Sequence, residues 1–176
     1  MANLLTAIRL LLIIPVAWAI ADPEFVPASI LLLLILIAIV TDYFDGIVAR
    51  ASNTASARGQ LFDHATDFLF VTSGLSGAAF AGVVSPVLPV LIFIAFSQYV
   101  LDSYFLFHQK QLRMSFLGRW NGIFYFLPLI LIALSRLSLF VEIRQIMEFV
   151  IGIVSLMLII STITSIIDRG LAPLRR

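Results

Sequence analysis

The sequence has no cysteine, only two histidines and few charged residues, which make up 12% of its 176 residues. The lack of cysteine excludes disulfides, iron–sulfur clusters and thiolate-bound zinc, and two histidines are too few for a histidine-rich metal site. Any bound metal must therefore have oxygen ligands. Soluble proteins are about 45–50% apolar and about 25% charged, whereas this chain is 61% hydrophobic. Its composition excludes a disordered chain, a DNA-binding domain and an ordinary cytosolic enzyme, and predicts an integral membrane protein.

Long apolar runs indicate an all-α fold. A membrane-spanning helix needs about 20 mostly apolar residues, and the runs here are continuous rather than alternating, which disfavours a β-barrel. With no visible repeat or soluble segment, we expect a single transmembrane domain over residues 1–176. The six predicted spans are Leu4–Ala21, Val26–Ala49, Leu61–Ala81, Val87–Phe107, Trp120–Leu134 and Ile146–Ile167.

Basic residues are distributed unevenly between the two sides of this predicted bundle. An even number of spans puts both termini on the same side as the loops at 50–59 and 108–119, and that side holds nine lysines and arginines. The other side holds only Arg136 and Arg144. Since basic loops stay in the cytoplasm, we predict cytoplasmic termini. An alternative for the first run is a cleaved signal peptide, because Ala19-Ile20-Ala21 resembles a signal-peptidase site.

Four aspartates lie near the predicted cytoplasmic ends of the second and third spans. Asp42 and Asp45 are three residues apart, and Asp63 and Asp67 are four apart, so each pair shares one helix face. The short connection makes the two helices antiparallel neighbours, which lets the four carboxylates converge. A single aspartate here is equally well explained as a capping or interfacial residue. Four together mark a functional site, because charges in membrane helices are costly. His64 lies off the Asp63 and Asp67 face, so we expect it to pack or hydrogen-bond.

Converging carboxylates repel one another strongly in a low dielectric, so cations must lie between them. Arg50 alone cannot neutralise four carboxylates, and hard divalent cations fit oxygen ligands better. Two metals about 3.5–4 Å apart would suit phosphoryl transfer. Gly46 and Gly59 leave room for a bulky ligand near the backbone. Ala49 keeps the same face open, and the planar guanidinium of Arg50 matches phosphate oxygens.

The segment from Asp42 to Asp67 resembles the signature of the CDP-alcohol phosphotransferases. It follows the pattern D-x2-D-G-x2-A-R-x8-G-x3-D-x3-D at all eight specified positions. The start of the chain, from Asn3 to Arg9, resembles the N-x2-T-x2-R opening of many phosphatidylglycerophosphate synthases. Phe68 is a departure, since these synthases often carry lysine after the last aspartate, and it leaves the acceptor open.

This resemblance implies transfer of a phosphatidyl group from CDP-diacylglycerol to an alcohol, with release of CMP. It implies an active site on the cytoplasmic side with two divalent cations, Mg²⁺ or Mn²⁺, on Asp42, Asp45, Asp63 and Asp67. Asp67 would also be the general base. The implied pocket for the CDP donor comprises Asn3, Thr6, Asp42, Gly46, Ala49, Arg50 and Gly59.

A second, basic cluster is expected to bind a phosphorylated acceptor, because phosphate recognition requires cations. The predicted acceptor-binding residues are Lys110, Arg113, Arg119 and Arg169. Glycerol 3-phosphate is our first choice of acceptor. Phosphatidylglycerol, which would make the chain a cardiolipin synthase, inositol phosphate and other alcohols stay open. A divalent-cation transporter is the non-enzymatic alternative, and the gathering of the acidic residues on one side argues against it.

Rows of small residues allow helices to approach closely. Gly74, Ala78 and Gly82 form one row, and Gly118 and Gly122 form another. Such rows serve either the bundle or a homodimer, and we expect the chain to form a homodimer.

Overall fold

The computed structural model describes residues 2–51, 57–101 and 116–171, and the regular elements in these ranges are all helices. They are α1 (Ala2–Ala21), α2 (Ala28–Ala51), α3 (Ala57–Phe80), α4 (Val87–Leu101), α5 (Phe116–Phe124), α6 (Phe126–Ser135), the 3-10 helix η2 (Ser138–Ile143) and α7 (Arg144–Leu171). The prediction of an all-α chain is confirmed for the described residues.

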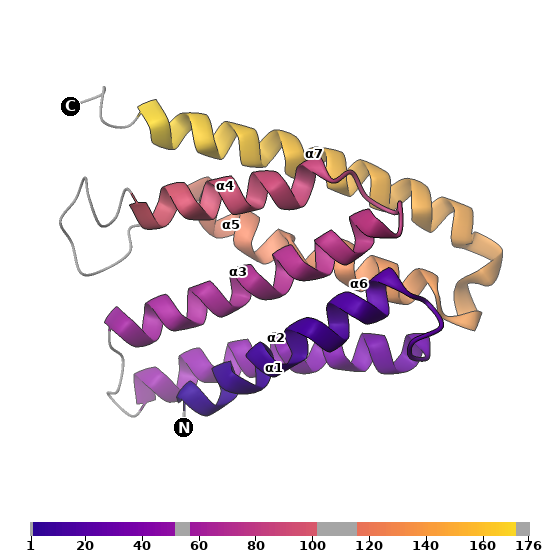
Figure 1. The fold of residues 1–176 in the computed structure, drawn as a ribbon, viewed down its shortest axis with the longest axis horizontal. Helices are drawn as coiled ribbons and strands as arrows, with labels where there is room; N and C mark the ends of the chain where they lie inside the picture. The colour runs from indigo at the N-terminus through magenta and orange to yellow at the C-terminus, as the bar shows by residue number, and fades with distance from the viewer. Residues whose placement is uncertain (1, 52–56, 102–115, 172–176) are drawn as a thin grey trace.

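The helices form an elongated bundle in which successive passes of the chain run in opposite directions (Figure 1). The beginning of α1 and the end of α7 lie at the same end of the bundle. The end of α2, the start of α3 and the start of α5 lie there as well, so residues far apart in the sequence gather at this end. We call it the N-terminal end of the bundle.

The core of the bundle is apolar and draws on helices from the whole chain. Val16 of α1, Ile35 of α2, Leu75 of α3, Leu129 of α6 and Ile151 of α7 are all buried. Because α1 supplies part of this core, it packs as an integral member of the bundle.

The outer surface of the bundle is also apolar. Leu11 and Ile14 of α1, Phe80 of α3 and Phe149 of α7 are largely exposed, with Phe80 exposed to 87%. Apolar surface of this extent is rare on soluble proteins and marks contact with a membrane or a partner. The surface therefore agrees with the composition in indicating a membrane protein.

Three helical stretches are long and apolar enough to cross a membrane: Ala28–Asp45, Phe116–Ser135 and Ser138–Leu171. Leu5–Ala21 and Val87–Leu101 are apolar but shorter. α3 falls short on hydropathy because it carries the charged and polar residues around Asp63 and Asp67. The predicted continuation of the fourth span to Phe107 lies outside the described residues.

The predicted fifth span, Trp120–Leu134, is divided into α5 and α6 at Tyr125. Pro128 explains the break. Proline has no N–H to donate to the carbonyl four residues earlier, and its ring clashes with that carbonyl, which here belongs to Phe124. The two short helices nevertheless follow each other along the bundle (Figure 1).

The small residues of α3 act inside the bundle. A Cβ built on Gly74 would meet the side chain of Leu129 at 3.0 Å, and Ala78 is fully buried. The closest approach occurs at Gly77, outside the predicted row, where a Cβ would lie 2.3 Å from the carbonyl oxygen of Ala17. Gly82 ends the helix with φ of +73° in a Schellman turn. Within the described residues, then, the row in α3 serves packing between helices and a helix end.

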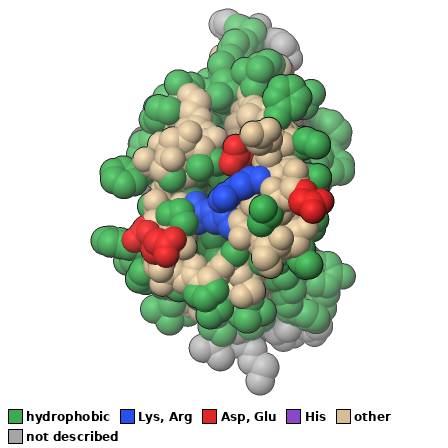
Figure 2. All heavy atoms as spheres, turned by 90° about the vertical axis from the view of Figure 1, so that its right-hand side faces the viewer, with side chains coloured by type: hydrophobic (Ala, Val, Ile, Leu, Met, Phe, Trp, Pro, Cys, Tyr) green, Lys and Arg blue, Asp and Glu red, His purple; other side chains and the backbone are tan. Residues whose placement is uncertain are grey.

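The opposite end of the bundle is organised by Arg136. Figure 2 shows this end, with basic side chains at its centre and acidic ones around them. The Arg136 guanidinium donates hydrogen bonds to the carbonyl oxygens of Ala19 and Ile20, at 2.7 and 2.6 Å. These carbonyls belong to the last turn of α1. Carbonyl oxygens in the last turn of a helix have no intrahelical N–H partner, so they need another donor. Burial, followed by the nearby Arg144, lowers the pKa of Arg136 below its ordinary value. Arg136 thus caps α1 and ties it to the end of α6.

Candidate functional site

The candidate site lies near the N-terminal end of the bundle, where a buried arginine meets three aspartates. Arg9 of α1 is completely buried. Its guanidinium lies 3.1 Å from Asp42 Oδ1 of α2 and 3.1 Å from Asp63 Oδ1 of α3. It also forms an ion pair and hydrogen bond with Asp67 of α3. The structure therefore brings three of the four predicted metal ligands together around one cation.

Asp45, the fourth predicted ligand, has a different partner. Its side chain is buried and accepts a hydrogen bond from the hydroxyl of Thr6. Thr6 and Arg9 are three residues apart on α1, so they occupy one face of that helix. This face thus contacts carboxylates of both α2 and α3. Thr6, a predicted residue of the CDP-donor pocket, contacts Asp45 in the described structure.

Helix geometry explains why these side chains meet. Asp42 and Asp45 occupy the last turns of α2, whereas Asp63 and Asp67 occupy the first turns of α3. Since α2 and α3 run antiparallel, the two pairs come to the same end of the bundle (Figure 1). The close approach of α1 to α3 at Gly77 then brings Arg9 alongside them.

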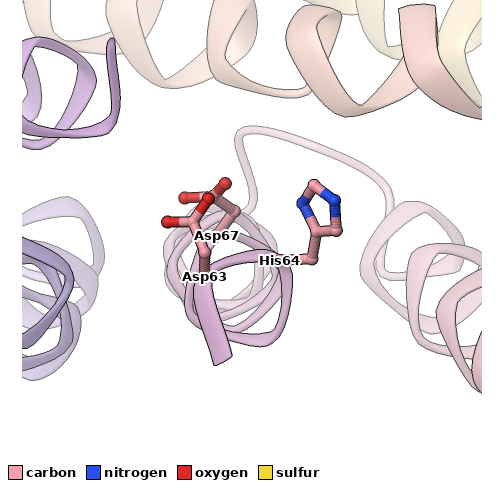
Figure 3. A group of neighbouring side chains, drawn as sticks. All are labelled: Asp63, His64 and Asp67. Carbon is pink, nitrogen blue, oxygen red and sulfur yellow. The ribbon is translucent and has the colours of Figure 1, made fainter. Parts of the chain in front are cut away.

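Asp63, His64 and Asp67 form a group whose possible ligand atoms lie within 4.8 Å of one another. Figure 3 shows the two carboxylates side by side on α3, with the imidazole directed to another side of the helix. His64 packs against Tyr99 of α4, with ring centroids 6.5 Å apart in an edge-to-face arrangement. The expected packing role of His64 is thus observed, and an imidazole nitrogen is also near the carboxylates.

A cavity of roughly 730 Å³ opens beside the carboxylates. Asp42, Asp63 and Asp67 line it, whereas Arg9 and Asp45 are not among the described residues that do so. Arg9, with no exposed surface, therefore lies behind the carboxylates as seen from the cavity. Asp42 is the most exposed of the three, at 41% for its side chain.

The cavity also has a basic side. Arg119 of α5 and Arg169 of α7 both line it, so two of the four predicted acceptor residues share a cavity with the aspartates. The Arg169 guanidinium lies 5.0 Å from the ring centre of Tyr99, in a cation–π arrangement. The cavity thus joins anionic groups from α2 and α3 to cationic groups from α5 and α7.

Deeper in the bundle, the cavity is apolar. One turn beyond Asp67 it is lined by Val71, and on the neighbouring helices by Ile92 and Ile130. Phe68, the departure from the synthase pattern, lines it too and stacks on Phe96 with ring centres 4.1 Å apart. The cavity therefore offers both a charged region and an apolar region to a ligand.

Several predicted site residues cannot be compared with this geometry. Asn3 lies in α1, and Gly46, Ala49 and Arg50 lie in α2, but their side chains are outside the described part of the structure. Lys110 and Arg113 are outside the described residues altogether. Gly59 lies in the first turn of α3 and is partly buried.

Two buried polar residues were absent from the predicted site. Arg9 was counted only as a basic residue and as part of the opening motif, although an arginine eight positions into an apolar helix is itself a signal of a buried ionic partner. The second residue is Asn121 of α5. It is buried, lines the cavity and accepts a hydrogen bond from Ser161 at 2.6 Å. Its amide nitrogen has no hydrogen-bond partner among the described residues.

This helical bundle has an apolar surface and a cavity lined by carboxylates, arginines and apolar side chains. Such a combination suits an enzyme that acts on phosphorylated, partly apolar substrates. Comparison with protein families agrees with this class, since the CDP-alcohol phosphatidyltransferase model matches residues 1–166. The chain belongs to the CDP-alcohol phosphatidyltransferase family. No individual curated protein matches the chain significantly.

Family membership makes the protein a transferase that moves a phosphatidyl group from a CDP-linked donor to an alcohol. The hypothesis of a cation transporter is therefore set aside. The family depends on divalent cations, and the donor set observed here fits them. Asp42, Asp63 and Asp67 present hard carboxylate oxygens at a cavity, and such oxygens are the ligands that Mg²⁺ prefers.

Proposed function

We propose that the protein transfers the phosphatidyl group of CDP-diacylglycerol to glycerol 3-phosphate and releases CMP. The observation that carries this proposal is the composition of the cavity, which is lined by Asp42, Asp63 and Asp67 as well as by Arg119 and Arg169. A reaction between a diphosphate donor and a phosphorylated acceptor needs cations for both partners. Carboxylates supply them indirectly by holding metal ions, and arginines supply them directly.

For the donor, the charged and apolar regions of the cavity match the two parts of CDP-diacylglycerol. Its diphosphate belongs near the aspartates, and its acyl chains belong near Val71 and Ile130 or in the surrounding lipid. Asp42, Asp45, Asp63 and Asp67 would hold two divalent cations, Mg²⁺ or Mn²⁺. When bound, these cations screen the diphosphate and stabilise the leaving CMP. Asn3, Thr6, Gly46, Ala49, Arg50 and Gly59 complete the proposed CDP pocket.

For the acceptor, Arg119 and Arg169 provide guanidinium groups in the same cavity. Arginine–phosphate contacts are strong and directional because the planar fork matches phosphate oxygens. The amide nitrogen of Asn121 is a buried donor in this region and suits a hydroxyl oxygen of a polyol. Lys110 and Arg113 belong to the proposed acceptor site on sequence grounds.

In the chemical step, the acceptor hydroxyl oxygen attacks the phosphorus of the phosphatidyl group, and the bond from that phosphorus to the CMP oxygen breaks. We propose that Asp67 accepts the proton of the attacking hydroxyl, a role implied by its position at the end of the family motif. Asp67 lines the cavity from the third turn of α3, so a hydroxyl in the cavity can approach its carboxylate.

We further propose that the chain crosses the membrane six times, with α5 and α6 forming one crossing, and that both termini and the active site face the cytoplasm. The alternating helix directions (Figure 1) and the basic residues near the N-terminal end of the bundle support this arrangement. A water-soluble acceptor and the released CMP then exchange directly with the cytoplasm. A homodimer stays part of the proposal on the row of Gly118 and Gly122 alone, since nothing comes within 4 Å of a Cβ built on Gly122.

An acceptor screen tests the proposed reaction. Purified protein is incubated with Mg²⁺, CDP-diacylglycerol and one acceptor at a time: glycerol 3-phosphate, phosphatidylglycerol, inositol phosphate or serine. Lipid products are identified by mass spectrometry and CMP is measured in parallel. We expect phosphatidylglycerophosphate and an equal amount of CMP with glycerol 3-phosphate. Product with serine but none with a phosphorylated acceptor would contradict the proposed roles of Arg119 and Arg169.

A further inference from the structure

The carboxylate cluster contains its own cation. Arg9 contacts Asp42, Asp63 and Asp67, which belong to two different helices. A buried arginine in contact with several carboxylates is unusual, because each ion loses its hydration and is stabilised only by its partners. Its presence here shows that a protein group already lies among the carboxylates.

The position of Arg9 is that of a fixed part of the protein interior and not of a group that meets the ligand. It is completely buried, and it is not among the described residues that line the cavity. The carboxylates therefore separate it from the space in which a ligand binds. Its helix is fixed against α3 by the backbone contact between Ala17 and Gly77, and Thr6 of the same face contacts Asp45. The backbone from which Arg9 extends is therefore held beside the cluster.

We propose that Arg9 is an internal counter-cation, which stabilises the carboxylate cluster when metal is absent and limits metal affinity when metal is present. The inference rests on the proposed function, since it takes these carboxylates to be the metal ligands. Without metal, Arg9 offsets part of the repulsion between the aspartates. With metal, the same positive charge repels the cations at short range and adds positive charge behind the diphosphate of the donor.

This role predicts opposite effects of one substitution on stability and on metal binding. Arg9→Met removes the charge and keeps an unbranched apolar side chain. In EDTA, its unfolding temperature should fall on the order of 10 °C, because breaking a buried ionic network is strongly destabilising. Its affinity for Mn²⁺ should rise at least tenfold, because a repulsive charge is removed and the metal-free state is destabilised. Arg9→Lys keeps the charge and should bind Mn²⁺ within threefold of the wild type.

Full-length protein in detergent serves for the experiment. Mn²⁺ binding is titrated by electron paramagnetic resonance of the free ion, and unfolding temperatures are measured in EDTA and in saturating Mn²⁺. Arg136→Met is the matched control, because Arg136 is a half-buried arginine with fixed partners but lies at the opposite end of the bundle. It should lower the unfolding temperature equally in both conditions and leave Mn²⁺ affinity within twofold.

An unchanged or weaker affinity for Mn²⁺ in Arg9→Met would overturn the inference and make Arg9 a positioning residue for the ligands. Equal losses of stability in EDTA and in Mn²⁺, or a protein that fails to fold in both, would also overturn it. An Arg9→Met protein that folds only with Mn²⁺ would support it. If the wild type shows no saturable Mn²⁺ binding, the metal site of the proposed function fails, and the inference fails with it. Wild-type binding without an Arg9→Met effect overturns the inference alone.

Discussion

The contact between α1 and α3 at Gly77 gives the most direct test of the architecture that builds the site. In Gly77→Ala, the added Cβ would lie 2.3 Å from the carbonyl oxygen of Ala17. A backbone oxygen cannot rotate away as a side chain can, so α1 must shift away from α3. Overpacking of this kind typically costs about 1–3 kcal/mol. We take the upper limit because the obstacle is backbone.

Alanine also has a favourable effect, since it is better than glycine inside a helix by roughly 1 kcal/mol. The net destabilisation expected for Gly77→Ala is therefore about 2 kcal/mol. For a chain of this size, 1 kcal/mol shifts the unfolding temperature by about 2–4 °C, so the variant should unfold about 4–8 °C lower. Because α1 carries Arg9 and Thr6, the shift should also reduce transferase activity.

Gly152→Ala is the matched control. Gly152 lies inside α7, and nothing comes within 4 Å of a Cβ built there. This variant should gain up to about 1 kcal/mol from helix propensity alone. Both proteins are compared with the wild type by thermal unfolding in the same detergent, together with a CMP-release assay. If Gly77→Ala proves as stable as Gly152→Ala, the close packing of α1 on α3 is refuted.

Three further predictions concern the chemistry. Asp63→Asn should abolish CMP release, and so should removal of divalent cations by EDTA. Added Mg²⁺ or Mn²⁺ should restore the activity of the wild type but not that of Asp63→Asn. Turnover in excess EDTA would contradict the metal dependence. Asp67→Asn should lower kcat by about 10²–10⁴-fold, the usual contribution of a general base, while the Kd of CDP-diacylglycerol changes little. If kcat and the affinity for the donor fell together, Asp67 would be chiefly a metal ligand. Arg119→Ala should raise the KM of glycerol 3-phosphate by roughly 10- to 100-fold and leave the KM of the donor nearly unchanged. This magnitude follows because a hydrogen bond to a charged group contributes about 1.5–3 kcal/mol. Arg144→Ala, at the other end of the bundle, is its control, and a shift of less than threefold in Arg119→Ala would refute the contact with the acceptor.

Much of the candidate site followed from local spacing. Intervals of three and four residues place Asp42 with Asp45 and Asp63 with Asp67 on helix faces, and a short connection makes their helices neighbours. These relations depend on helix geometry alone, so the sequence predicts them. By contrast, the division of the fifth span at Tyr125 was missed, although Pro128 was visible, because a proline in a membrane helix can either bend it or break it.

Contacts between distant segments were beyond such reasoning. The partnership of Arg9 with three aspartates joins residues more than thirty positions apart, and no spacing rule connects α1 to α2 and α3. The same holds for Arg136, which was counted only as a basic residue on the far side. In the structure its guanidinium caps the last turn of α1.

The sequence by itself determined the helical class, the membrane setting and the four aspartates of the family motif, because composition and short-range periodicity carry that information. Only the tertiary structure decided which cation lies among the aspartates and which arginines share their cavity. These relations depend on how α1 packs against α2 and α3, and on how α4 and α6 join α5 and α7 to those helices. Packing is fixed by close contacts such as Gly77 with Ala17, in which shape complementarity, and not any local pattern, determines the partner.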